Sequence, residues 1–230
     1  MKIFVVGCSY TNWSDSGDQN PGSTWPALLA QSNTDDVIVD CSYPGLSNNA
    51  YFFRLQQAEN SFGKADKVIV QWTLPYRDFY ILKDDYESVD WMQIHNNYFC
   101  NHFNKNDVWI KLRPQQDLDY ASEMLNVPKK IIAKYVATWL DSPNVKYHFE
   151  REFKLINSYY GKDNVLNYLH VNDKIFQPYI ENMYGCAKDS MPSFENFRFD
   201  FEGHLTIQGH KKLYKWLTPG ITNLLAKGNK

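Results

Sequence analysis

Three short apolar runs have the composition of buried strands. They span residues 3–7, 37–41 and 67–72, and each is rich in β-branched side chains and followed by turn-forming residues. Residues 165–169 form a fourth run of the same kind. Strands that are apolar on both faces are typical of parallel sheets with helices on both sides, so the four runs predict such a sheet.

Stretches with helical spacing alternate with these strands. The apolar residues 25–30 follow a polar loop, and residues 47–62 permit an amphipathic helix capped by Ser47 or Asn48. The alternation predicts an α/β fold, a three-layer sandwich with a mainly parallel, flavodoxin-like central sheet.

A last helix is expected to begin after Thr206. It carries Leu213 and Leu217 on one face. We expect Pro219 to break this helix, because proline lacks the backbone donor that a helix interior needs, and a short amphipathic piece to follow at residues 221–226.

Residues 78–160 fit the alternating pattern less well. Residues 117–140 and 143–160 predict helices, whereas residues 78–107 are aromatic and rich in Asn, with no clear period. We interpret the region as a helical or aromatic insertion into a single domain that spans residues 1–230. Whether it serves as a lid, an interface or plain scaffold stays open.

Composition excludes several classes of function. The 230 residues are 43% hydrophobic and 22% charged with a net charge of −2, so nothing indicates binding to nucleic acid or to an anionic membrane. No apolar run approaches the roughly 20 residues of a transmembrane helix, and we find no signal peptide, so synthesis in the cytoplasm is expected. The four cysteines lack zinc-ligand spacing, and we expect buried thiols, no metal and no cofactor.

A serine follows the first predicted strand, in the sequence Gly7-Cys8-Ser9-Tyr10. Ligands of open α/β sheets bind at the carboxyl ends of the strands, which makes Ser9 a candidate nucleophile. Adjacent residues leaving a strand tend to point in opposite directions, so only one of Cys8 and Ser9 can face the crevice. The alternative is a serine that merely hydrogen-bonds its own loop.

Acidic residues and a histidine precede the last predicted helix. Asp200 and Glu202 lie shortly before His204. A serine is a weak nucleophile at neutral pH unless an adjacent base activates it, and that base is best held by a carboxylate. The alternative is a histidine that only bonds the backbone at the helix entry, with Glu202 a solvated charge.

Together these two segments resemble the first and last blocks of the SGNH (GDSL-type) hydrolase family, with Cys8 in place of the usual Asp. The resemblance implies that Ser9 is the nucleophile, His204 the general base and Glu202 the orienting acid, with Asp200 as the fallback. It also implies that the Ser9 hydroxyl lies within hydrogen-bond reach of the His204 ring.

Two further segments bear on an oxyanion hole. The segment after the second predicted strand is similar to the second block of the family, which implies an oxyanion donor at the Gly45 backbone and a polar side chain at Asn48. Residues 72–77 depart from the third block and resemble a Trp-Thr-x-Pro-x-Arg version found in divergent, often phage-encoded, members. Losing the third-block Asn typically costs about 10²–10³ in rate unless Asn48, Thr73 or Arg77 replaces it.

The resemblance implies a serine esterase acting on a small-molecule or glycan ester, for example an O-acetyl group on a carbohydrate. The missing Asn favours the alternative, a non-catalytic binding or virion structural module that retains the fold and whose partners are further copies of the chain or other virion components. A nucleotide-binding domain ranks lower, because no glycine-rich phosphate loop is present. Aromatic residues near the predicted crevice are candidates to stack on a sugar or to cover an acyl chain, although core packing is the commoner use of such rings: Tyr10, Trp13, Tyr43, Trp72 and Tyr76.

Overall fold

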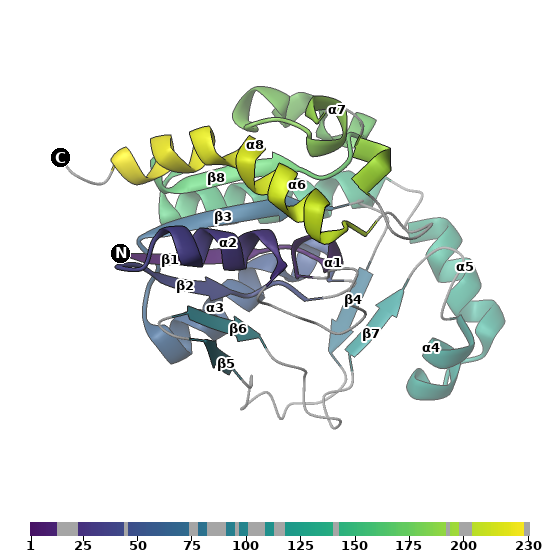
Figure 1. Ribbon diagram of the computed structural model, residues 1–230. Helices are drawn as coiled ribbons and strands as arrows, with labels where there is room; N and C mark the ends of the chain where they lie inside the picture. The colour runs from purple at the N-terminus through teal and green to yellow at the C-terminus, as the bar shows by residue number, and fades with distance from the viewer. Residues whose placement is uncertain are drawn as a thin grey trace.

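A six-stranded sheet forms the centre of the computed structural model, in the order β5-β6-β2-β1-β3-β8 (Figure 1). The structure describes residues 1–12, 23–43, 46–73, 78–81, 91–94, 97–100, 109–112, 118–139, 143–191, 194–197 and 204–227. The strands of the sheet are β1 (Lys2–Val6), β2 (Val37–Asp40), β3 (Lys67–Trp72), β5 (Trp91–Ile94), β6 (Asn97–Cys100) and β8 (Val165–Leu169). Neighbouring strands run parallel except at one edge, where β5 and β6 are antiparallel.

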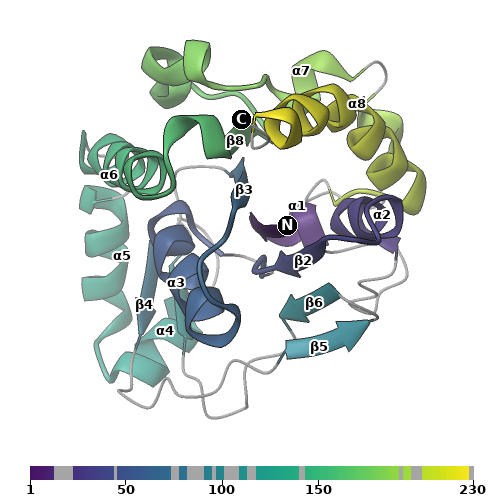
Figure 2. The ribbon, with the colours of Figure 1, turned by 90° about the vertical axis from the view of Figure 1, so that its left-hand side faces the viewer.

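Helices cover both faces of this sheet, as Figure 2 shows. Along β1 the side chains alternate: Phe4 and Val6 pack toward one face, and Ile3 and Val5 toward the other. The first face is covered by α3 (Tyr51–Phe62) and α6 (Pro143–Tyr160), and the second by α2 (Trp25–Ser32) and α8 (Ile207–Ala226). The three-layer α/β architecture is therefore confirmed.

The strand order determines where a ligand site is expected. Four strands follow the flavodoxin-like order β2-β1-β3-β8, in which the connection after β1 leads to β2 on one side and the connection after β3 leads to β8 on the other. Crevices form where the connections diverge in this way, beyond the carboxyl ends of the strands. Gly7 and Thr73, which directly follow β1 and β3, lie at this edge.

The remaining elements are short. Two further strands, β4 (Asp78–Ile81) and β7 (Trp109–Leu112), pair antiparallel in a separate sheet. The other helices are α1 (Ser9–Asn12), α4 (Leu118–Leu125), α5 (Lys129–Trp139) and α7 (Ala187–Ser190). The 3₁₀ segments are η2 (Asn48–Ala50), η3 (Lys162–Asn164), η4 (Lys174–Asn182) and η5 (Phe194–Phe197).

The middle of the chain differs from the prediction in two ways. The single helix expected over residues 117–140 is two helices, since Asn126 adopts a left-handed backbone with φ of 52° and Pro128 follows it. The region 78–160 also contains strands, and β6 pairs with β2, so it is not only a helical insertion. This stretch widens the main sheet as well as supplying α6.

The predicted break in the last helix is wrong, because α8 continues through Pro219. A proline inside a helix leaves the carbonyl four positions earlier, here that of Lys215, without its backbone donor. The Tyr184 hydroxyl donates to the carbonyl of the adjacent Trp216 at 2.8 Å, which adds a tertiary bond to this turn. An apolar face that spans both sides of the proline also holds the helix on the sheet: Leu213, Leu217, Ile221 and Leu224.

Two general expectations can be compared with the described residues. In that part of the chain, no helix is both long and apolar enough to cross a bilayer. Cys8, Cys41 and Cys186 are buried free thiols, as the wide cysteine spacing predicted.

Candidate active site

The structure brings together Ser9 and His204, which lie 195 positions apart in the sequence. The Ser9 Oγ is 2.8 Å from the His204 Nε2. Both side chains are nearly buried, with 5% and 9% exposed. This is hydrogen-bond distance, and it matches the separation that the sequence analysis expected for a nucleophile and its base.

A buried glutamine at the end of β3 holds the turn that carries Ser9. The Gln71 Oε1 accepts hydrogen bonds from the Cys8 backbone N–H at 3.2 Å and from the Thr11 hydroxyl at 2.7 Å. Gly7 makes this close approach feasible, since a Cβ at that position would collide with the Thr11 hydroxyl and with Gln71 Oε1. Gln71 thus binds the backbone before the candidate nucleophile and a side chain after it.

The neighbouring thiol points away from the histidine. Cys8 is fully buried, and its Sγ lies 3.2 Å from the Thr73 Oγ1 and 3.6 Å from the Gln71 Oε1. Cys8 belongs to the core on the α3 and α6 side of the sheet. Of the two adjacent candidates, Ser9 alone faces the imidazole.

The start of α8 determines the position of His204. Thr206 caps this helix, its hydroxyl accepting from the Gly209 N–H at 3.0 Å, as the sequence predicted. Leu205 is fully buried in the core, and the His210 Nδ1 accepts from the Trp25 N–H at 3.3 Å, which ties α8 to α2. The buried Leu205 and the cap at Thr206 therefore fix the backbone that directly follows His204.

A second histidine at this edge was not singled out from the sequence. His170 directly follows β8 and is 2% exposed, and its ring stacks on Tyr10 with centroids 3.8 Å apart. The Tyr10 ring also lies 5.5 Å from the His204 ring. A polar residue immediately after a buried strand was the signal that could have identified His170, as it did for Ser9.

Two predicted oxyanion residues bond to each other. The Asn48 Nδ2 donates to the Thr73 carbonyl, and the Thr73 N–H donates to the Asn48 Oδ1, both at 3.0 Å. Each side chain is nearly or fully buried. These bonds join the loop after β2 to the end of β3, while the Asn48 side-chain amide retains a second N–H group.

Several predicted residues fall outside the described part of the chain. They are the candidate acids Glu202 and Asp200, the oxyanion glycine Gly45, the candidate anion ligand Arg77, and the aromatic residues Trp13 and Tyr76.

Of the two uses expected for these aromatic residues, Trp72 serves core packing and not ligand stacking. Its side chain is fully buried and packs on the rings of Tyr51, Phe149 and Phe153. Tyr43 packs against the same core cluster and is partly buried. Of the five aromatic candidates, Tyr10 lies beside the Ser9–His204 pair.

Comparison with known proteins bears on the fold. No model of a known protein family matches the sequence, and no curated protein matches it. Among solved structures, the chain is similar to the psychrotrophic esterase EstA from Pseudoalteromonas sp., inhibited by monoethylphosphonate, with 9% identity, a TM-score of 0.50 and 98% of each chain covered. It is also similar to TesA, with 10% identity, a TM-score of 0.45 and coverage of 97% of this chain and 99% of the other. The similarity to EstA shows a shared α/β fold over nearly the whole chain.

Proposed function

We propose that the protein is a serine esterase of the SGNH (GDSL) type. The observation that carries the proposal is the 2.8 Å separation between the Ser9 hydroxyl and the His204 Nε2 at the carboxyl edge of a parallel sheet. The fold shared with an esterase supports it.

In this mechanism His204 takes the proton of Ser9 as the serine oxygen attacks the ester carbonyl. A bond forms between the Ser9 Oγ and the carbonyl carbon, and the resulting intermediate collapses as His204 returns the proton to the leaving alcohol. Water then attacks the acyl-enzyme by the same route, which releases the acid and restores Ser9. Glu202 would orient the imidazole, with Asp200 as the fallback.

Backbone amides are the first candidates to stabilise the oxyanion. The Cys8 N–H is bound by Gln71, so the Ser9 N–H is the next amide along the turn. It would act with the Gly45 N–H, and with the second N–H of the Asn48 amide or the Thr73 hydroxyl in place of the missing Asn. Arg77 would bind an anionic group of the substrate.

The proposed substrate is a small-molecule or glycan ester, with an O-acetylated carbohydrate as the first choice. This choice follows the family resemblance and not a particular residue of the site. No cofactor enters the mechanism.

Labelling with a fluorophosphonate tests the proposal. We expect stoichiometric labelling of the wild-type protein, and loss of labelling in Ser9→Ala and in His204→Ala. Ser61→Ala and His148→Ala, which change the same residue types elsewhere, should be labelled like the wild type.

A folded wild-type protein that takes up no label would contradict the esterase and favour the non-catalytic module. Labelling that survives in Ser9→Ala would place the nucleophile elsewhere. Release of acetate from an O-acetylated glycan, measured with the same variants, tests the substrate separately.

A further inference from the structure

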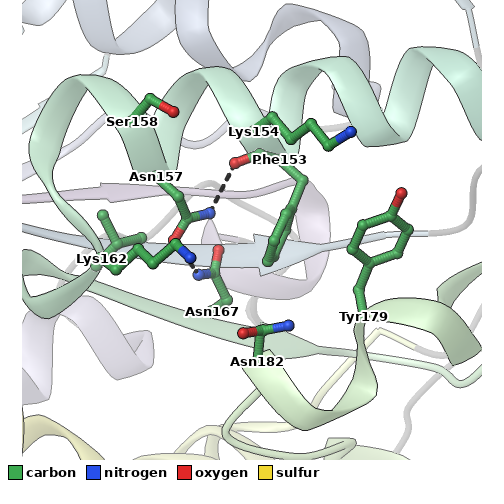
Figure 3. A pocket seen from close by; sticks show the side chains of 9 residues that line it. Phe153, Lys154, Asn157, Ser158, Lys162, Asn167, Tyr179 and Asn182 are labelled. Carbon is green, nitrogen blue, oxygen red and sulfur yellow. Dashed lines mark hydrogen bonds between the residues drawn. The ribbon is translucent and has the colours of Figure 1, made fainter.

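A pocket lies away from the Ser9–His204 pair. It has a volume of about 440 Å³ and is formed by α6, η3, β8 and η4 (Figure 3). Its β8 residues are Val165 and Asn167 in the first half of the strand, whereas Ser9 lies beyond the opposite end of the sheet. This volume is within the range of roughly 300–1,000 Å³ that small-molecule sites occupy.

Two buried amides form one wall of this pocket. Asn157 and Asn167 are 7% and 4% exposed. The Asn167 Oδ1 accepts from the Trp72 indole N–H at 3.0 Å, and its Nδ2 donates to the Asn157 Oδ1 at 3.0 Å. The Asn157 Nδ2 in turn donates to the Phe153 carbonyl at 2.7 Å.

These bonds orient the two amides and leave hydrogen-bonding capacity. A primary amide has two N–H groups and an oxygen with two lone pairs. Asn157 and Asn167 each use one N–H group in the bonds described above, so one N–H group of each remains for a ligand. The exposed Asn182 and Ser158 also line the pocket. The wall therefore offers both donors and acceptors, which suits hydroxyl groups better than a bare anion that only accepts.

The charge of the lining is positive. Lys154 and Lys162 line the pocket, and no carboxylate does. Lys154 is paired with Glu150 on its own helix. Within the described residues no carboxylate lies at ion-pair distance from Lys162, so its ammonium group is available to a ligand.

Aromatic rings complete the lining. Phe153 and Tyr179 lie with their ring centroids 5.2 Å apart, on the side of the pocket away from Lys162 (Figure 3). Such rings pack against the C–H face of a flat, hydroxylated ligand.

We propose that this pocket binds a hydroxylated carboxylate of the size of an acidic monosaccharide. The amides of Asn157, Asn167 and Asn182 would bind its hydroxyl groups, Lys162 its carboxylate, and Phe153 and Tyr179 its apolar face. This site is separate from the proposed esterase centre, and it binds whether or not the protein hydrolyses esters.

Calorimetric titration of the full chain with glucuronate, glucose and inorganic phosphate tests the proposal. We expect glucuronate to bind saturably and about tenfold more tightly than glucose, because a charge-assisted bond is added, and phosphate to bind more weakly than glucuronate. Ser9→Ala should bind glucuronate like the wild type. In amide NMR spectra, glucuronate should shift the side-chain resonances of Asn157 and Asn167.

Substitutions of exposed lysines distinguish binding in the pocket from nonspecific attraction of glucuronate to positive charge. Lys162→Ala should weaken glucuronate about tenfold and leave glucose unchanged, and Lys162→Arg should retain binding. Lys211→Ala, an exposed lysine on α8, serves as the matched control and should bind like the wild type.

Three results would overturn the proposal. They are no binding of glucuronate, equal affinity for phosphate and glucuronate, or equal weakening by Lys162→Ala and Lys211→Ala. None of these results alters fluorophosphonate labelling at Ser9, so the two proposals can fail independently.

Discussion

The Tyr10 ring stacks on the His170 imidazole with centroids 3.8 Å apart and planes 8° from parallel. The same tyrosine ring is tilted against the His204 ring at 5.5 Å. Tyr10 thus lies between two imidazoles that come from different elements, and it directly follows Ser9. This arrangement packs an aromatic ring against the candidate base.

Removal of the Tyr10 ring should slow the reaction of Ser9. An aromatic contact is worth about 0.5–1.5 kcal/mol, so we expect Tyr10→Ala to lower the rate of fluorophosphonate labelling about three- to tenfold. Tyr10→Phe keeps the ring and should stay close to the wild-type rate. Labelling of Tyr10→Ala at the wild-type rate would show that the stack does not position His204.

Gly7→Ala should destabilise the fold. The added Cβ would lie 2.7 Å from the Gln71 Oε1 and closer still to the Thr11 hydroxyl. Overpacking of this kind costs about 1–3 kcal/mol, which urea denaturation measures. The double variant with Thr11→Ala relieves one of the two collisions and should recover part of the loss. A Gly7→Ala protein as stable as the wild type would contradict the close packing.

Asp40 should make the protein less stable as the pH rises. Burial raises the pKa of this carboxyl from 3.8 to about 6, against the opposing effects of the bonds from Ser42 and the charge of Arg54. The folded state therefore holds its proton more tightly than the unfolded state. The contribution to stability is complete below about pH 4 and is lost as the pH rises through about 6, a change of roughly 3 kcal/mol.

Asp40→Asn should remove most of this pH dependence. The free energy of unfolding, measured in urea at intervals from about pH 4 to 7, should become flatter and higher at neutral pH. Burial also raises the pKa of Glu152, so a smaller slope of the same sign should remain. The exposed Asp35→Asn serves as a control with the wild-type slope. An unchanged slope in Asp40→Asn would contradict the assignment.

Tyr184→Phe should weaken the turn of α8 around Pro219. The lost hydrogen bond to the Trp216 carbonyl predicts a decrease of about 1 kcal/mol in the free energy of unfolding. A Tyr184→Phe protein as stable as the wild type in urea denaturation would show that this bond does not stabilise the turn.

The sequence was most informative where one local pattern determines the structure. The short, mainly apolar runs predicted β3 and β8 to the residue, and helical spacing predicted the bounds of α6. The aromatic stretch that forms β4, β5 and β6 alternates in no regular way. β5 and β6 pair with each other, but β4 pairs with β7 and β6 with β2, which lie far along the chain, so no local signal marks their places in the sheets.

In the candidate site, too, the sequence predicted what a local motif determines and missed what depends on distant parts of the chain. Short motifs identified Ser9 and His204, and the structure places them together. The roles of Gln71 and His170 depend on three strand ends meeting at one edge of the sheet, which a motif does not encode. Likewise, the sequence analysis missed the break at Asn126, which depends on a single backbone angle. It also predicted a break at Pro219, where tertiary contacts keep the helix continuous.

The 195 positions between Ser9 and His204 have a consequence for biosynthesis. A growing chain that has already formed β1, β2 and β3 still lacks the imidazole, so its serine remains an ordinary alcohol while other proteins surround it. Under the proposed function, reactivity therefore arises only when α8 docks and brings His204 to Ser9. Under the proposed function, a fluorophosphonate added during refolding would therefore time the closure of the native structure.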